Sequence, residues 1–222
     1  MRVVDMEQER MEQEKTPEGK RKKLLQNIAT ILAVAVFVAV MYLVYHHPFF
    51  VGQPHMVLVD GVTIVPGETT MEELNKEGYE LSDWDHSEMV KENGKMQHIY
   101  TEVLDLSTQI EPRTYYSMVL VKEGLGYATV EFVNESSSSV PITACKIRAV
   151  TVADYHEASQ NAQLEGILFD ELTVDALSAA SGLETEELNE TYYTWEKGNY
   201  LMRLEFRENG TVESFTSGYE KQ

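Results

Sequence analysis

The chain has 222 residues and a formal net charge of −19, with 37 aspartates and glutamates against 18 lysines and arginines. This acidity argues against a nucleic-acid partner, because phosphate groups are bound by lysine and arginine. Cys145 is the single cysteine, so no disulfide forms within the chain. No motif for catalysis, for a cofactor or for a metal stands out, and we therefore expect a protein without a cofactor or a metal site.

Residues 24–45 form an apolar stretch in which Thr30 is the only clearly polar side chain after Asn27. About 22 residues of α-helix span roughly 33 Å, close to the roughly 30 Å of a bilayer's hydrocarbon core. The sequence therefore predicts a transmembrane helix. A cleaved signal peptide is the alternative. It is disfavoured because the stretch exceeds the roughly 7–15 apolar residues of a signal peptide and no small-x-small cleavage site follows.

The flanking charges predict the orientation of this span. After it, the next lysine or arginine is Lys76. By the positive-inside rule, residues 1–23 would be a disordered cytoplasmic tail and residues 46–55 an extracellular linker. The chain is then expected in the cell membrane as a single-pass signal-anchor protein with its C-terminal domain outside. The basic residues that carry this prediction directly precede the span: Lys20, Arg21, Lys22 and Lys23.

Residues 24–222 carry 31 acidic and 11 basic side chains, a net charge of −20. We interpret this excess as a solubilising surface. A surface that binds cations or a basic partner is the alternative interpretation.

Residues 56–153 show the pattern of a first α+β half. Asp60-Gly61 lies between two short apolar runs, which predicts a hairpin with a type I′ turn. Thr69 and Thr70 are each followed three residues later by glutamate, which predicts a capped helix that ends near Gly78. Cys145 alternates with apolar residues and is expected to be buried. Strands are expected at residues 99–106, 115–121, 127–133 and 142–152.

Residues 154–222 show a similar order of elements and are expected to form a second half. Thr173 is placed to cap a short helix that Gly182 ends. An antiparallel meander is expected to follow, because alternating apolar residues are separated by Gly- and Asn-containing turns. Its strands would be residues 191–195, 200–207 and 211–218. The predicted fold class is therefore α+β, with a transmembrane helix followed by two helix-plus-antiparallel-meander halves.

Three segments carry a resemblance to a known type of repeat: residues 66–78, 144–150 and 193–215. They resemble the helix-plus-meander repeats of the β-lactamase-inhibitor-protein and small outer-membrane lipoprotein type, related forms of which occur on Gram-positive cell surfaces. The resemblance implies protein binding or envelope assembly through the concave face of the sheet. It implies no catalytic residue.

The predicted function is that of a non-enzymatic extracellular binding module of the bacterial envelope, which engages a protein or a wall component. A regulatory or signalling accessory subunit of a membrane complex is the alternative, and a wall or peptide hydrolase is a third hypothesis. A binding module should expose aromatic side chains. The candidates are Trp84, Tyr115, Tyr193, Trp195, Tyr200 and Tyr219.

Two of these interpretations leave alternatives open. Trp84 lies among Asp83, Asp85 and His86, which fits either a binding loop or a half-buried residue that covers the core. His46, His47 and His55 could suggest a metal site. No carboxylate or thiol accompanies them, and we interpret them as histidines at the membrane interface.

Overall fold

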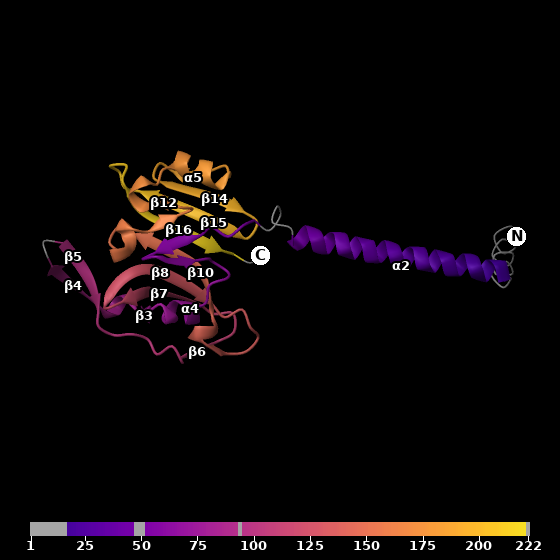
Figure 1. Ribbon diagram of the computed structural model, residues 1–222, viewed down its shortest axis with the longest axis horizontal. Helices are drawn as coiled ribbons and strands as arrows, with labels where there is room; N and C mark the ends of the chain where they lie inside the picture. The colour runs from indigo at the N-terminus through magenta and orange to yellow at the C-terminus, as the bar shows by residue number, and fades with distance from the viewer. Residues whose placement is uncertain (1–16, 47–51, 93–94, 221–222) are drawn as a thin grey trace, which may run out of the picture. The chain divides into compact units, whose positions relative to one another are not determined.

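A computed structural model describes residues 17–46, 52–92 and 95–220 (Figure 1). The chain divides into two compact units, Met1–Phe50 and Val51–Gln222. The predicted tail over residues 1–23 and the predicted linker over residues 46–55 fall partly outside the described residues. The boundaries predicted for these segments remain predictions.

The described part of the first unit is one helix, α2 (Pro17–His46). It includes the four basic residues of the predicted topology signal, and its described apolar side chains are exposed.

Among the residues that the structure describes, no helix has the length and apolar character that crossing a membrane requires. This finding contradicts the transmembrane helix predicted over residues 24–45. The single-pass, signal-anchor topology, the membrane as a partner and the localisation in the cell membrane all depended on that span. Without the span, these three predictions are wrong. The same holds for the orientation inferred from Lys20, Arg21, Lys22 and Lys23.

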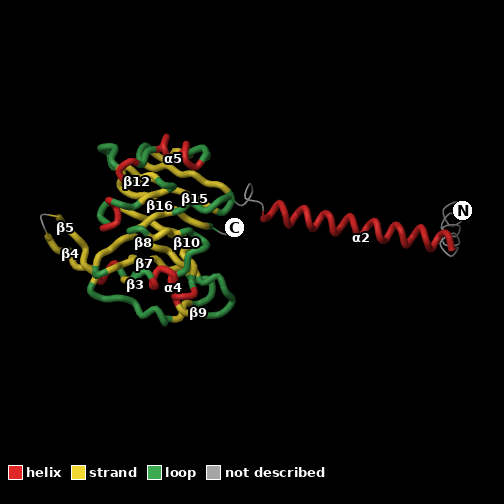
Figure 2. Tube along the Cα trace, in the orientation of Figure 1, coloured by secondary structure: helices red, strands yellow, loops and turns green. Residues whose placement is uncertain are grey.

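The second unit is built mainly of β-strands, drawn in yellow in Figure 2. Its described α-helices are α4 (Met71–Lys76) and α5 (Val174–Ser181). Short 3-10 helices are η1 (Trp84–His86), η2 (Ile142–Ala144), η3 (Glu157–Gln160) and η4 (Phe169–Glu171). The first strands are β1 (Val57–Val59), β2 (Val62–Ile64), β3 (Glu80–Ser82), β4 (Ser87–Glu92), β5 (Lys95–Tyr100), β6 (Gln109–Ile110), β7 (Tyr115–Lys122) and β8 (Leu125–Val133). The later strands are β9 (Val140–Pro141), β10 (Lys146–Ala153), β11 (Gln163–Leu164), β12 (Ile167–Leu168), β13 (Glu186–Asn189), β14 (Tyr192–Lys197), β15 (Tyr200–Phe206) and β16 (Val212–Tyr219).

One large antiparallel sheet runs through the whole second unit. Its strand order is β13-β14-β15-β16-β10-β8-β5-β4, with β7 beside β8 and β3 beside β7. Figure 1 shows β8, β10, β16 and β15 lying side by side. A smaller sheet has the order β12-β11-β1-β2, and β6 pairs with β9.

The core contains buried residues of both sheets and both short helices. In β8, Ala128, Val130 and Phe132 are fully buried while the residues between them are partly exposed, so one face of the large sheet packs inward. Side chains from other elements belong to the same cluster: Val57, Ile64, Met71, Leu74, Leu164, Leu177, Trp195 and Phe215.

The predicted architecture of two helix-plus-meander halves is contradicted. Strand β10 pairs with β8 on one side and with β16 on the other, so the strands of both predicted halves form one continuous sheet. The pairing of Val152 with Phe215 joins residues that are far apart in the chain. Helices contribute only short segments to this unit. The unit is therefore mostly β rather than α+β.

Several local predictions are confirmed. Asp60 and Gly61 have φ angles of 46° and 80° and connect β1 to β2, as a type I′ turn requires. Thr70 and Glu73 form the capping box of α4. Thr173 caps α5, and Gly182 ends it in the left-handed conformation. Other boundaries were wrong: the strand expected at residues 99–106 ends at Tyr100, and the one expected at residues 142–152 begins with η2.

Candidate functional site

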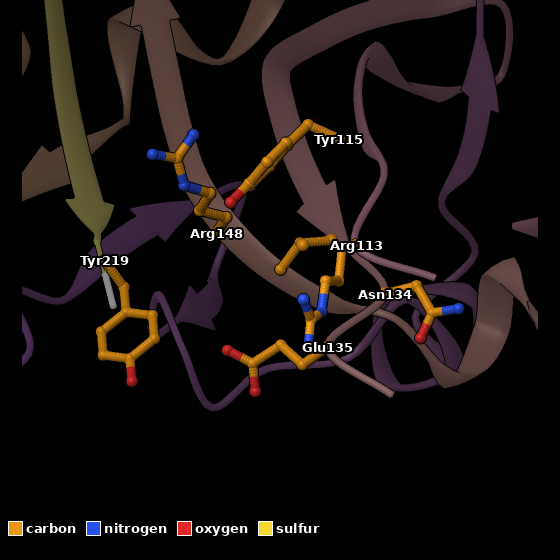
Figure 3. Close-up of a pocket in the computed structure, with 7 residues that line it drawn as sticks. Arg113, Tyr115, Asn134, Glu135, Arg148 and Tyr219 are labelled. Atoms are coloured by element: carbon orange, nitrogen blue, oxygen red, sulfur yellow. The ribbon is translucent and has the colours of Figure 1, made fainter. Parts of the chain in front are cut away.

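A cavity of about 560 Å³ opens at one end of the large sheet (Figure 3). Strand β7 begins there, β8 and β16 end there, and β10 begins nearby. The lining residues come from these four strands and from the turns beside them. They are Arg113, Tyr115, Val133, Asn134, Glu135, Arg148 and Tyr219.

Arg148 and Tyr115 form the upper part of the cavity in Figure 3. The Arg148 guanidinium carbon lies 4.7 Å from the centre of the Tyr115 ring, a cation–π arrangement. Tyr115 is 60% exposed despite this contact. Glu131 and Glu220 pair with the two terminal nitrogens of Arg148 at 3.2 and 3.1 Å. Arg148 is thus fixed by two carboxylates, and it in turn holds the exposed ring of Tyr115.

A β-bulge explains how Arg148 reaches this position. The register between β10 and β8 shifts between Ile147 and Ala149, so Arg148 has no direct partner on β8. A bulge changes the direction of a side chain relative to the regular alternation. Arg148 therefore lies on the same face of the sheet as Glu131, which is paired with Ala149.

Arg113 lines the cavity below Tyr115 in Figure 3 and has a φ angle of 58°. This left-handed conformation is uncommon for residues other than glycine and costs on the order of 1 kcal/mol. The backbone N–H of Arg113 donates to the carbonyl of Asn134 at 2.8 Å, which holds the turn in place. The strained turn is therefore stabilised by the segment that follows β8.

The buried side chain of Asn134 connects two segments at this end of the sheet. Its side chain is 1% exposed and its Nδ2 donates to the carbonyls of Ile110 and Ser138, both at 2.8 Å. Its Oδ1 accepts from the backbone N–H of Ser136 at 2.9 Å. One amide side chain thus ties the segment before Arg113 to the serine-rich turn after β8.

Tyr219 forms the wall nearest the end of β16. Its ring lies 5.2 Å from that of Tyr200, and it covers the backbone of Gly67. Gly67 has a φ angle of +83°, and a Cβ atom there would lie 2.9 Å from the Tyr219 ring. A glycine is needed at this position both for the backbone conformation and for the close approach of the ring.

Charges in the cavity are only partly paired. Arg148 is neutralised by its two carboxylates, whereas Arg113 and Glu135 have no ion pair within 4 Å among the described residues. Figure 3 shows both of these side chains at the cavity. One positive and one negative group are therefore available to a ligand, next to an exposed aromatic ring.

The predicted binding residues fall into three groups. Tyr115 and Tyr219 line the cavity, and Tyr200 stacks on Tyr219. Tyr193 packs edge-on against Phe206, and Trp195 is completely buried with its Nε1 donating to Ser178 Oγ at 2.9 Å. Trp84 belongs to a separate exposed cluster with His98 and Tyr155.

The polar members of the cavity were not found from the sequence: Arg113, Asn134, Glu135 and Arg148. An arginine inside an alternating strand was a possible signal for Arg148, but a bulge cannot be located from the sequence pattern. Asn134 occurs in a serine-rich segment that reads as an ordinary turn.

The histidine and cysteine predictions have different outcomes. Cys145 is buried as predicted, and burial raises the pKa of its thiol. His55 is 7% exposed, with Nδ1 3.0 Å from Glu165 Oε1, so its interfacial interpretation is wrong. The side chains of residues 46 and 47 lie outside the described ones. In the described parts of the chain, no cluster of three or more His, Cys, Asp or Glu side chains is arranged to bind a metal ion.

Comparison with protein-family models, with curated proteins and with solved structures gave no match to this chain. The resemblance to helix-plus-meander repeats therefore stays a prediction from the sequence.

Proposed function

We propose that the chain is a non-enzymatic binding module that takes up a short segment of a partner protein in the cavity around Tyr115. The observation that carries the proposal is the exposed ring of Tyr115, which Arg148 contacts, in the same cavity as Arg113, which forms no ion pair with any residue that the structure describes. Partly exposed tyrosines and arginines are the residues that most often dominate protein interfaces.

The charges suggest how such a segment is held. Arg113 pairs with a carboxylate of the partner, since a guanidinium offers two parallel donors to a carboxylate. Glu135 accepts from a backbone N–H or a basic side chain of the same segment. Tyr115 and Tyr219 provide aromatic surface on other walls of the same cavity (Figure 3).

Pre-organisation supports binding at this place. Arg148 is held by two ion pairs and Asn134 by three hydrogen bonds, so these two side chains lose little freedom when a partner binds beside them. The described lining contains a single carboxylate, Glu135, and no serine or cysteine nucleophile paired with a histidine or lysine base. A binding role therefore suits this lining better than a hydrolytic one.

A site-specific crosslink tests the proposal. Tyr115 is replaced by the photoreactive p-benzoylphenylalanine, which keeps an aromatic ring, and the full chain is irradiated in its native cells. We expect one discrete protein adduct at position 115. The adduct should be lost when Arg113→Glu is added, and it should persist with Lys91→Glu.

Lys91→Glu is the matched control because it changes the net charge equally but lies on β4. Strand β5, the partner of β4, meets β8 at Leu125, whereas the cavity is at Val133. An adduct that survives Arg113→Glu unchanged would show that the cavity does not select the partner. If neither the Arg113→Glu variant nor the Lys91→Glu variant gives an adduct, that result also counts against the proposal.

A further inference from the structure

A second exposed aromatic cluster lies at the other end of β8. Trp84 of η1 is 4.7 Å from His98 of β5 and 5.4 Å from Tyr155, which follows β10, measured between ring centres. Trp84 is 42% exposed and Tyr155 is 53% exposed. Three segments distant in sequence thus bring rings together at the surface. We call these three residues the Trp84 cluster.

The rings of the Trp84 cluster are held in place from below. Asp83 Oδ1 accepts from the backbone N–H of Asp85 at 3.1 Å and caps η1. The ring of Trp84 lies 6.3 Å from that of Tyr100, which is buried, and burial raises the pKa of Tyr100 to about 12. The exposed ring of Trp84 therefore rests on a capped 3-10 helix and a buried ring rather than on a loose loop.

Neighbouring segments anchor the other two rings. His98 Nδ1 lies 3.2 Å from Ser87 Oγ. His156, next to Tyr155, is buried and its Nδ1 accepts from the backbone N–H of Ala153 at 2.9 Å. Met89 is directly opposite His98 in the β4–β5 pair and is 61% exposed, which extends the apolar surface along the hairpin.

Carboxylates surround this apolar surface. Asp83 and Asp85 are exposed on either side of Trp84 in the chain. Glu102 Oε2 lies 3.8 Å from His86 Nε2, and Glu157 lines the same small cavity as His98 and Tyr155. Residues 83–105 contain six acidic residues against two lysines. The surroundings of the rings are thus strongly negative.

From this arrangement we propose that the Trp84 cluster binds an arginine-bearing basic segment of a partner protein. A guanidinium stacks on the face of an indole or phenol ring, and nearby carboxylates strengthen its attraction to that place. An acidic segment is repelled. A second copy of this chain, with its net charge of −19, is disfavoured for the same reason.

This site is separate from the cavity around Tyr115. The two are at opposite ends of β8, where Leu125 pairs with Ile99 and Val133 pairs with Tyr115. Eight residues of strand separate these positions by about 26 Å. The proposal goes beyond the proposed function and does not depend on it.

Titrations of the isotope-labelled full chain, followed by nuclear magnetic resonance, test the proposal. The probe is the capped pentapeptide Gly-Arg-Gly-Arg-Gly at pH 7.5. We expect saturable shifts of the Trp84 indole N–H and of the backbone amides of residues 155–157, and weaker binding at higher salt. Two capped peptides serve as comparisons, in which both arginines are replaced by glutamate or by norleucine.

Variants locate the binding, with the Kd taken from amide shifts so that loss of the indole does not remove the signal. Trp84→Leu should raise the Kd about threefold to tenfold, and Trp84→Phe should restore most of the affinity. Tyr115→Leu, in the other cavity, should leave the Kd unchanged. If Trp84→Leu does not fold, Tyr155→Leu provides the same comparison at a more exposed ring.

Three results would each overturn the proposal. One is equal binding of the norleucine peptide, which would show an apolar site without preference for a cation. Another is a Kd within twofold of the unmodified chain for both Trp84→Leu and Tyr155→Leu. The third is a set of shifts confined to residues 113–115. A lost crosslink at position 115 would leave this proposal standing, so the two proposals fail separately.

Discussion

The buried side chain of Asn134 should contribute substantially to the stability of the second unit. It is 1% exposed and makes three hydrogen bonds to the backbone, at 2.8, 2.8 and 2.9 Å. A net contribution of about 1 kcal/mol per hydrogen bond gives about 3 kcal/mol for their joint loss in Asn134→Ala. For a unit of this size, that loss lowers the Tm by about 6–12 °C.

Urea unfolding followed by circular dichroism measures this loss, provided that the slope of the transition is unchanged. Asn209→Ala is the matched control. Asn209 also bonds to nearby atoms, with Oδ1 3.0 Å from the backbone nitrogen of Thr211, but it lies in an exposed turn where water replaces it. We expect the control to lose less than about 1 kcal/mol. If Asn134→Ala also loses less than about 1 kcal/mol, the buried amide does not hold this end of the sheet together.

Three further predictions concern other parts of the second unit. Burial, and to a lesser degree His98, lowers the pKa of His156 to about 3, so the unfolded chain binds a proton there that the folded chain does not. The free energy of unfolding is therefore unaffected by His156 above about pH 6.5, and it falls by up to about 1.4 kcal/mol per pH unit as the pH is lowered towards 3. Measured by unfolding at a series of pH values, this decrease should be smaller for His156→Gln. Gly67→Ala should destabilise more than Gly210→Ala by about 1–3 kcal/mol. Both glycines have a φ angle above 80°, but only at Gly67 would the new Cβ meet a ring, that of Tyr219; equal losses in thermal melts would rule out this contact. Trp195→Ala should cost about 3–5 kcal/mol because the indole is fully buried, and a loss below about 2 kcal/mol in urea unfolding would contradict that packing.

Local structure was readily predicted where the chemistry of one or two residues decides it. Asp60-Gly61 produced the expected turn, and Thr70 with Glu73 produced the expected cap, because both depend on contacts within a few residues. The strands around Phe132 and Leu204 followed their alternation of apolar and polar side chains.

Pairing between distant strands could not be predicted in the same way. The two predicted halves became one sheet because β10 pairs with β16, and neither strand carries a local signal for that choice. Alternation fixes which face of a strand is buried but not which strand lies beside it. Residues 80–98 have a polar sequence without a clear strand pattern, yet they contribute to β3, η1, β4 and β5. Pairing with other strands, which the sequence pattern does not show, gives this segment its structure.

The candidate site shows the same division between local and long-range information. Aromatic residues were considered as binding candidates by residue type, but their burial depends on the face of the sheet on which they lie. Tyr115 is on the face that carries Glu131, whereas Trp195 is on the face that packs against α5 and is completely buried. Arg148 came to the site through a bulge, and Arg113 through a strained turn. Neither feature has a reliable sequence pattern.

The position of β16 in the large sheet has a consequence for the folding of the chain. This strand lies between β15 and β10, and its pairing with β10 connects residues about 65 positions apart. During synthesis, β7, β8 and β10 are complete long before residues 212–219 exist, and one side of β10 stays unpaired until then. Such an edge is prone to pair with other chains, and long-range pairing is slow. We therefore expect a nascent chain of this protein to be most prone to aggregation before β16 has been synthesised.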